Sequence, residues 1–295
     1  MASWEEATAV QQLDSKTYTC NFHDDWCIGT VPNGGYVTGC ILEVVSKHFH
    51  TSLAKLHQPH TIALHVEFLR RTQVGLATFK VEDVKIGRQT SIVHVHMSQD
   101  GREEIVAYVT NSNIHTEQGV TFDTHYELHP QRPAVDFGKL ELDTDENWKR
   151  IRENPFPKFR KALSRLHLYS PRTGQTVAHT ADQWVCFTDG KNFTDSSVGF
   201  VADMFPQILE WHRDPGQYWY PTLLLNLDVK KTLPKEGVKW LGNRVQLKKV
   251  HNGRMDIEVH IFDDAGDIVA LSHHVAFVLD ASRNLAKRKD QDSKI

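Results

Sequence analysis

The spacing of apolar positions predicts two similar amphipathic helices, the second lying 164 positions after the first. In residues 34–48, apolar side chains and one histidine recur every three or four residues, at Val37, Cys40, Ile41, Val44, Val45 and His48. In residues 198–212 the same spacing holds for Val201, Met204, Phe205, Ile208, Leu209 and His212. A one-sided stripe of this kind is typical of a helix that packs one face against a core.

Each predicted helix is followed by a segment in which apolar and polar residues alternate. Residues 60–68 place Ile62, Leu64, Val66 and Phe68 on one face, and residues 221–229 do the same with Leu223, Leu225, Leu227 and Val229. Alternation with a period of two is the pattern of a half-buried strand. A Gly-Arg pair follows in each case, at 87–88 and at 253–254. The chain therefore contains a duplicated unit, and differences between the copies are the first place to look for chemistry.

The remaining pattern extends each copy into a run of strands. Strands are expected at 16–22, 61–69, 76–86, 90–98 and 104–111, and again at 181–189, 222–230, 238–250, 254–262 and 268–279. One helix followed by an antiparallel meander is an α+β pattern. The division that follows is an N-terminal domain at 1–116, a connection at 117–165 with a short helix near 145–152, a C-terminal domain at 166–281 and a flexible tail at 282–295. A length of 295 residues agrees with two domains.

Composition narrows the set of partners. A hydrophobic content of 40% supplies a core for each copy, and a net charge of −3 gives no reason to expect nucleic acid. No apolar run approaches the roughly 18 residues of a membrane span, and the first residues lack a basic-then-apolar signal sequence. The four cysteines include no Cys-x-x-Cys pair, so they are expected to be reduced and buried.

Several kinds of site are not expected. The sequence has no Gly-x-Ser-x-Gly, no His-Glu-x-x-His and no glycine-rich phosphate loop with a lysine. His94 and His96 lie on one face of a predicted strand, but no third carboxylate or cysteine ligand stands near them in the sequence. We therefore expect no metal and no organic cofactor.

The loop before the first helix carries the first candidate site. Asn33 can cap the helix, and Gly34 and Gly35 allow a ligand or another backbone to approach the exposed N–H groups. These three residues are candidates for substrate binding. The segment 32–36 resembles the helix start of hotdog-fold acyl-CoA thioesterases, and residues 68–101 resemble the strands that follow it in that family. The resemblance covers most of residues 20–115 and 175–280. It implies a tandem double hotdog of the thioesterase II type, with two antiparallel sheets, each wrapped around a central helix.

The resemblance also implies three catalytic positions, an Asp, a Thr and a Gln. By motif these fall on Asp203, where the N-terminal copy has Gly39, on Thr222, and on His274, where imidazole replaces the carboxamide. Read without the family, Asp203 lies off the apolar stripe and is expected to be an exposed helix carboxylate, although Pro206 can kink that helix.

The other two candidates also have ordinary interpretations. Thr222 has a counterpart in Thr61, which a shared role at a strand start explains. His274 shares its strand face with small residues, which leave room for a ligand. His273 shares the opposite face with larger apolar residues, so we expect it to be buried, and we keep it as a further candidate for substrate binding.

The expected function is hydrolysis of an acyl thioester, acyl-CoA above all, to free acid and thiol. Asp203 would activate the water, while Thr222 and His274 would position it and support charge on the thioester oxygen. Two alternatives stay open. One is a biosynthetic hotdog enzyme that cyclises, eliminates from or hydrolyses a polyketide-like substrate. The other is a non-catalytic binder of acyl or aromatic ligands.

Two further expectations concern assembly and location. The sequence leaves open whether the chain forms a homo-oligomer. The last three residues, Ser293-Lys294-Ile295, resemble the peroxisomal Ser-Lys-Leu address. They predict a peroxisomal import receptor as partner and a peroxisomal location. A chance tripeptide in a cytoplasmic protein is the alternative.

Overall fold

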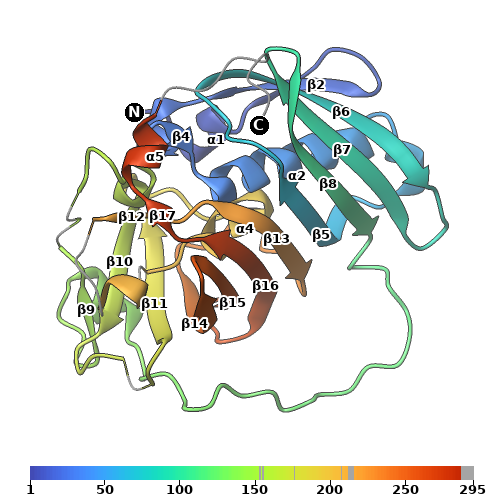
Figure 1. Ribbon diagram of the computed structural model, residues 1–295. Coiled ribbons are helices and arrows are strands. Elements are labelled where there is room, and N and C mark those ends of the chain that lie inside the picture. Colours follow the sequence, from blue (N-terminus) through green and yellow to red (C-terminus); the bar gives the residue numbers. More distant parts are fainter. Residues whose placement is uncertain (153, 155, 176, 207, 212–215, 287–295) are drawn as a thin grey trace.

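The computed structural model describes residues 1–152, 154, 156–175, 177–206, 208–211 and 216–286, and within them thirteen strands form one antiparallel sheet (Figure 1). In sheet order these are β1 Val10–Gln12, β2 Thr17–Phe22, β6 Gly75–Lys85, β7 Ser91–Gln99, β8 Arg102–Ser112, β5 His60–Phe68, β13 Thr222–Val229, β16 Ile268–Phe277, β15 Arg254–Phe262, β14 Leu241–His251, β11 Thr180–Phe187, β10 Leu166–Pro171 and β9 Trp148–Arg150. Two short pairs stand apart from it, β3 Cys27–Ile28 with β4 Val31–Pro32, and β12 Tyr218–Trp219 with β17 Leu279–Asp280.

The two copies meet where β5 pairs with β13. Val66 lies opposite Leu225 and Leu64 lies opposite Leu227, and all four side chains are buried. The apolar faces predicted for these strands therefore form one continuous core. The resemblance implied two sheets, each wrapped around its own helix and joined as in a hotdog dimer. Two separate sheets are not confirmed, because the backbone hydrogen bonds of β5 and β13 join them into a single sheet.

The first predicted helix is confirmed as α2, Gly34–His50, which packs against the N-terminal strands (Figure 1). Asn33 is its N-cap, since the Asn33 side chain accepts a hydrogen bond from the Tyr36 N–H at 3.0 Å. The whole predicted apolar stripe of this helix is buried.

The second predicted helix is much shorter than the stripe suggested. After the 3₁₀ turn η4 (Asp195–Ser197), α4 covers only Val198–Ala202, and a second 3₁₀ turn, η5, follows at Ile208–Trp211. Proline has no N–H and disfavours helical backbone in the residue before it, so Pro206 prevents α4 from continuing. Met204 and Ile208 are buried all the same, Met204 in irregular backbone and Ile208 at the start of η5. His212 lies outside the described residues.

The connection between the copies contains short elements that the sequence did not predict. It runs as an extended trace from β8 to α3, Phe137–Glu141, and on to the edge strand β9, which pairs with β10 (Figure 1). The prediction of a short helix near 145–152 is wrong. Extended backbone there buries Trp148 in a small second core with Leu140, Tyr169, Trp184, Cys186 and Trp240. A 3₁₀ turn, η3 (Ala162–Arg165), leads into β10. The domain boundaries stay a prediction.

Both ends of the described chain fold onto the body. Residues 4–7 form α1, Trp4–Ala7, and residues 282–285 form α5, Ser282–Leu285. Buried Asn284 accepts from the Thr30 N–H at 3.1 Å and donates to the Ile28 carbonyl at 2.9 Å. The prediction of a flexible tail is therefore wrong for residues 282–285. Ser293-Lys294-Ile295 lies outside the described residues.

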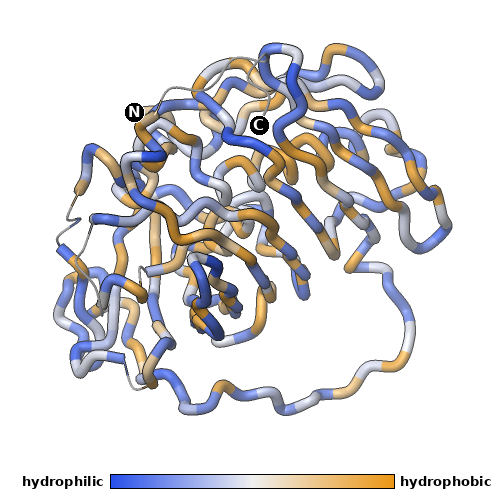
Figure 2. The backbone as a smooth tube through the Cα atoms, in the orientation of Figure 1, coloured by the Kyte–Doolittle hydropathy of each residue, from blue (hydrophilic) through white to orange (hydrophobic). Residues whose placement is uncertain are grey.

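Hydrophobic segments concentrate between the sheet and α2, and polar residues dominate the connection and the strand ends (Figure 2). No helix among the described residues is long and apolar enough to span a membrane. All four cysteines are free and buried, as expected. Burial raises the pKa of the Cys27 thiol to about 12 and that of Cys186 to about 11, so both thiols stay protonated at neutral pH.

Candidate active site

Asp203 lies where α4 ends, and its carboxylate meets the N-terminus of α2. Oδ2 accepts a hydrogen bond from the Gly35 N–H at 2.8 Å and one from Asn33 Nδ2 at 3.2 Å. The N-terminus of a helix favours negative charge because its first N–H groups are unpaired and its dipole is positive there. Only 6% of Asp203 is exposed. The expectation of an exposed helix carboxylate is wrong, because the helix stops one residue before it.

Two glycines make this close approach possible. A Cβ on Gly35 would lie 2.7 Å from the Asp203 Cβ and 2.8 Å from the Gly199 carbonyl oxygen, closer than real side chains come. A Cβ on Gly34 would lie 2.9 Å from Asp203 Oδ2. The two glycines therefore allow another group to come close to the start of α2, as predicted. At Gly35 that group is the backbone of α4 together with the Asp203 side chain. The structure gives the Gly34 N–H no hydrogen-bond partner among the described residues.

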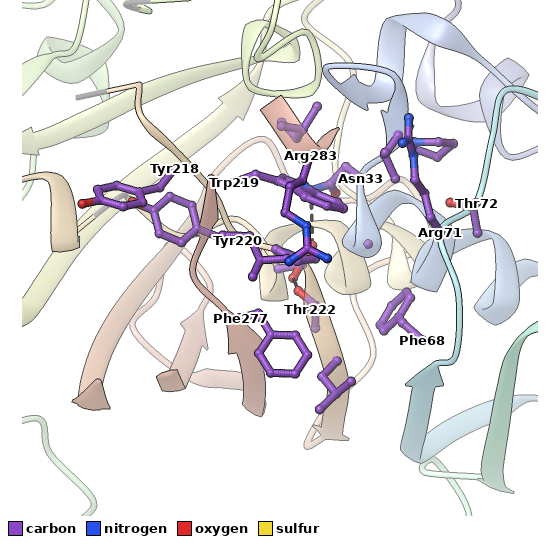
Figure 3. A pocket seen from close by; sticks show the side chains of 18 of the residues that line it. Asn33, Phe68, Arg71, Thr72, Tyr218, Trp219, Tyr220, Thr222, Phe277 and Arg283 are labelled. Atoms are coloured by element: carbon purple, nitrogen blue, oxygen red, sulfur yellow. Dashed lines mark hydrogen bonds between the residues drawn. The ribbon is translucent and has the colours of Figure 1, made fainter. Parts of the chain in front are cut away.

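The other carboxylate oxygen joins the remaining predicted residues. Thr222 Oγ1, at the start of β13, donates to Asp203 Oδ1 at 3.0 Å. His274 Nδ1, on β16, lies 3.4 Å from the same oxygen. The hydrogen bonds of Asn33 and Thr222 to Asp203 are drawn as dashed lines in Figure 3. The structure therefore brings Asp203, Thr222 and His274 together.

His274 is fully buried behind Asp203, and Ser272 fixes its orientation. The Ser272 hydroxyl donates to the Asn226 carbonyl at 2.8 Å, so its oxygen must accept from His274 Nε2–H, 2.7 Å away. His274 Nδ1 then faces the carboxylate with no hydrogen-bond partner among the described residues. The imidazole therefore stands behind the carboxylate, with Nδ1 directed at Oδ1.

Ser272 is a functional residue that the sequence reasoning did not single out. It stands two positions before His274 on the same strand face, and that spacing is the signal that could have identified it.

His273 is not part of this site. Its side chain is exposed, on the opposite face of β16 from His274. The prediction that it is buried is wrong because the larger side chains beside it on β16, Leu271 and Val275, lie on the outer face of the sheet and are only half-buried. The smaller side chains face inward because α4 and Asp203 occupy that space.

A cavity of about 450 Å³ opens in front of Asp203. Asn33, Gly34, Asp203 and Thr222 line its inner end. Its walls are rich in aromatic side chains, namely Phe68, Phe159, Phe205, Tyr218, Trp219 and Tyr220. Figure 3 shows Arg283, from α5, pointing into this cavity, and the structure pairs it with no carboxylate among the described residues. The sequence analysis did not identify Arg283, because this residue lies in the segment predicted to be a tail. His274 does not line the cavity.

The N-terminal copy has no equivalent of this polar group. In the C-terminal copy Leu225 lies opposite His274 and Leu227 lies opposite Ser272. The corresponding pairs in the N-terminal copy are Leu64 with Val109 and Val66 with Ala107. Apolar residues thus replace both His274 and Ser272 there.

The position that corresponds to Asp203 is Gly39, and the N-terminal segment fills the space beside it. A Cβ on Gly39 would lie 2.5 Å from the ring of Trp4. Trp4 is buried, and its Nε1–H donates to Ser196 Oγ at 3.1 Å. The part of the chain that the structure describes therefore has one carboxylate centre of this kind, not two.

A duplicated unit of an antiparallel meander packed on a helix is the architecture expected of a double hotdog. Residues 22–112 match the family model of the acyl-CoA thioesterase N-terminal domain, and residues 131–278 match that of the acyl-CoA thioesterase C-terminal domain. The chain belongs to the acyl-CoA thioesterase family and is a hydrolase of that family.

Individual relatives agree with this placement. The chain is 33% identical to the thioesterase-like protein TwmA of Talaromyces wortmannii over 97% of this chain and 95% of that one. A hot dog fold protein from Alicyclobacillus acidocaldarius superposes with a TM-score of 0.74 at 16% identity, over 95% of this chain and 98% of that one. The acyl-CoA thioesterase II TesB2 from Mycobacterium marinum superposes with a TM-score of 0.65 at 16% identity, over 95% of this chain and 100% of that one. These likenesses confirm the hotdog fold.

Proposed function

We propose that the protein hydrolyses an acyl-CoA or a related acyl thioester with a water molecule activated by Asp203. The observation that carries this proposal is a carboxylate on the cavity wall that is buried yet held by three donated hydrogen bonds, from Gly35, Asn33 and Thr222. A carboxylate fixed in this way keeps one orientation, and positioning is a large part of what a general base contributes.

The reaction that this geometry supports is a direct attack by water. The water oxygen bonds to the thioester carbon while its proton passes to Asp203. The carbonyl oxygen takes up negative charge, and the Gly34 N–H, at the N-terminus of α2, is the donor available to stabilise it. The C–S bond then breaks, the thiol sulfur takes up the proton, and the free acid leaves.

In this proposal His274 is a positioning residue, because it lies behind Asp203 and does not line the cavity. Its Nδ1 faces Asp203 Oδ1 from the side opposite the substrate, at 3.4 Å. That location argues against His274 as an acid or base acting directly on the substrate, which the cyclisation and elimination alternatives would need.

The cavity supports a substrate with flat or apolar acyl groups. Its aromatic walls offer contact area for such groups, and Arg283 offers a positive charge for a phosphate of coenzyme A. A biosynthetic version of the same hydrolysis is a second candidate, favoured by the 33% identity to the thioesterase-like protein TwmA. It differs in the substrate and not in the role of Asp203.

One experiment separates the candidates. Parent protein, Asp203→Asn and the control Asp228→Asn, an exposed carboxylate on the outer face of β13, are assayed with a panel of acyl-CoAs and aromatic thioesters. Thiol release and the acyl product are both measured. Release of free acid in parent and control supports hydrolysis. Release of thiol with a cyclic or unsaturated product supports the biosynthetic alternative. Saturable binding without thiol release supports a non-catalytic binder.

A further inference from the structure

The outer face of β6, β7 and β8 carries a cluster of two histidines and two glutamates. None of these four residues lines the cavity in front of Asp203. In β7 the residues of one face are buried, and His94 and His96 lie on the other, half-buried face. Glu82 of β6 stands directly opposite His94 in the strand register. Paired residues share a face of the sheet, so three side chains with metal-ligating atoms meet on neighbouring strands.

The distances between these side chains suit a single ion. One ligating atom each from Glu82, His94 and His96 lie within 4.8 Å of one another, and His96 Nε2 is 3.8 Å from Glu82 Oε2. Zinc–nitrogen and zinc–oxygen bonds of ~2.0–2.2 Å place tetrahedral ligands ~3.3 Å apart. Small side-chain rotations on this outer face would shorten the 3.8 Å separation between His96 Nε2 and Glu82 Oε2 to that value.

A fourth residue fixes the orientation of one histidine. Glu103 Oε1 lies 2.6 Å from His96 Nδ1 and accepts its proton. The lone pair of a neutral His96 is therefore on Nε2, the nitrogen that faces Glu82. A carboxylate behind a ligating histidine is the usual outer partner in metal sites, where it sets the tautomer and increases the basicity of the ligand.

His94 provides the second independent observation. Its Nε2 is buried and has no hydrogen-bond partner among the described residues. Its ring stacks on Tyr108 with centroids 4.3 Å apart and an interplanar angle of 5°, and it lies 4.0 Å from the His96 ring. Nε2 of His94 therefore lacks a partner beside a second imidazole, and a cation between the two rings and Glu82 would supply one.

We propose that Glu82, His94 and His96 form a binding site for a divalent transition metal ion, with Glu103 as the outer carboxylate. Two imidazoles and one carboxylate select zinc, nickel or copper over magnesium and calcium, which prefer oxygen ligands. The ion ties β6 to β7 on the face turned away from α2, so its role is structural. The sequence suggested no metal because the third ligand is not near His94 in the chain. The register of β6 and β7 brings Glu82 there.

The test is metal titration of the full chain without a histidine tag, after treatment with a chelator. Isothermal titration with zinc chloride should show one ion per chain, and cobalt should give the visible absorption bands of a nitrogen-bound ion. His94→Ala and His96→Ala should each lower the affinity by at least ~100-fold, and Glu103→Gln by ~10–100-fold, as loss of an outer carboxylate does. Glu82→Gln should also weaken zinc binding, although glutamine has nearly the same shape as glutamate, because the amide carries no negative charge.

A second histidine pair supplies the matched control. His60 and His115 have ring centroids 4.7 Å apart, but no grouping of three ligands forms around them in the described structure. His115→Ala should leave zinc affinity unchanged. Absence of zinc binding in the parent, equal binding in His96→Ala, or loss of binding in His115→Ala would each overturn the proposal. Thermal melting without metal checks that each variant is folded, and zinc should raise the melting temperature of the parent but not of His96→Ala.

Discussion

Replacing Asp203 by asparagine removes the proposed base and leaves most of its contacts in place. The amide oxygen can occupy the position of Oδ2 and keep the bonds from Gly35 N–H and Asn33 Nδ2. The amide nitrogen then takes the position of Oδ1, where the Thr222 hydroxyl and a neutral His274 Nδ1 can both accept from it. We therefore expect the unfolding free energy to change by only about 1 kcal/mol, the net value of a single hydrogen bond.

The effect on turnover should be far larger. An amide cannot take the proton from the attacking water, and a positioned acid–base group contributes ~10²–10⁴-fold to rate. At ~1.4 kcal/mol for each factor of ten, this corresponds to ~2.7–5.4 kcal/mol of transition-state stabilisation. A loss of rate this large with a stability change this small would separate a catalytic role for Asp203 from a structural one.

The assay is continuous detection of free thiol from the best acyl-CoA of the panel, together with thermal melting of both proteins. Substrate affinity should stay close to that of the parent, because the carboxylate is proposed to act on the water. A variant that hydrolyses the substrate at the parental rate would refute the mechanism. A variant whose melting temperature collapses would show that Asp203 is structural, and the rate could not then be assigned to base catalysis.

Three other outcomes follow from the same geometry. Gly35→Ala should lower turnover at least ~10-fold and cost ~1–3 kcal/mol of stability, because its Cβ would overlap α4, whereas the control Gly119→Ala, with open space around it, should change neither. His274→Gln should retain much of the parental rate, because an amide can also reach Asp203 Oδ1 and Ser272 Oγ, and loss of all activity in a folded His274→Gln variant would contradict a positioning role. Calorimetry with a non-hydrolysable acyl-CoA analogue should find one tight site per chain, and two equal sites would contradict the asymmetry of the copies.

Strands and the first helix could be predicted because their signals are local and repeated. The alternation in residues 60–68 and 221–229 gives the buried faces of β5 and β13 correctly, and the stripe of α2 is buried along its whole length. The joining of the two sheets was expected only from the family resemblance, and the pattern of residues could not predict the pairing of β5 with β13, since it links segments about 160 positions apart.

Asp203, Thr222 and His274 do lie together, while their roles stay a prediction. The exposure of Asp203 was predicted wrongly because the helical stripe continued through Pro206. The sequence analysis assigned His273 to the inside because hydrophobicity alone cannot tell which face of a strand meets the core when the outer face is also apolar. A mutual placement of this kind depends on tertiary packing.

Covalent linkage of the two copies has a consequence for how such a protein can vary. In a pair of identical chains, each substitution appears twice, so a residue that suits one site is imposed on the other. Within this single chain Val109 and His274 occupy matching positions and are free to differ. One copy can specialise for chemistry while the other, with Trp4 packed beside Gly39, becomes a scaffold that anchors the start of the chain. Fusion thus turns a symmetric pair into two independently mutable halves.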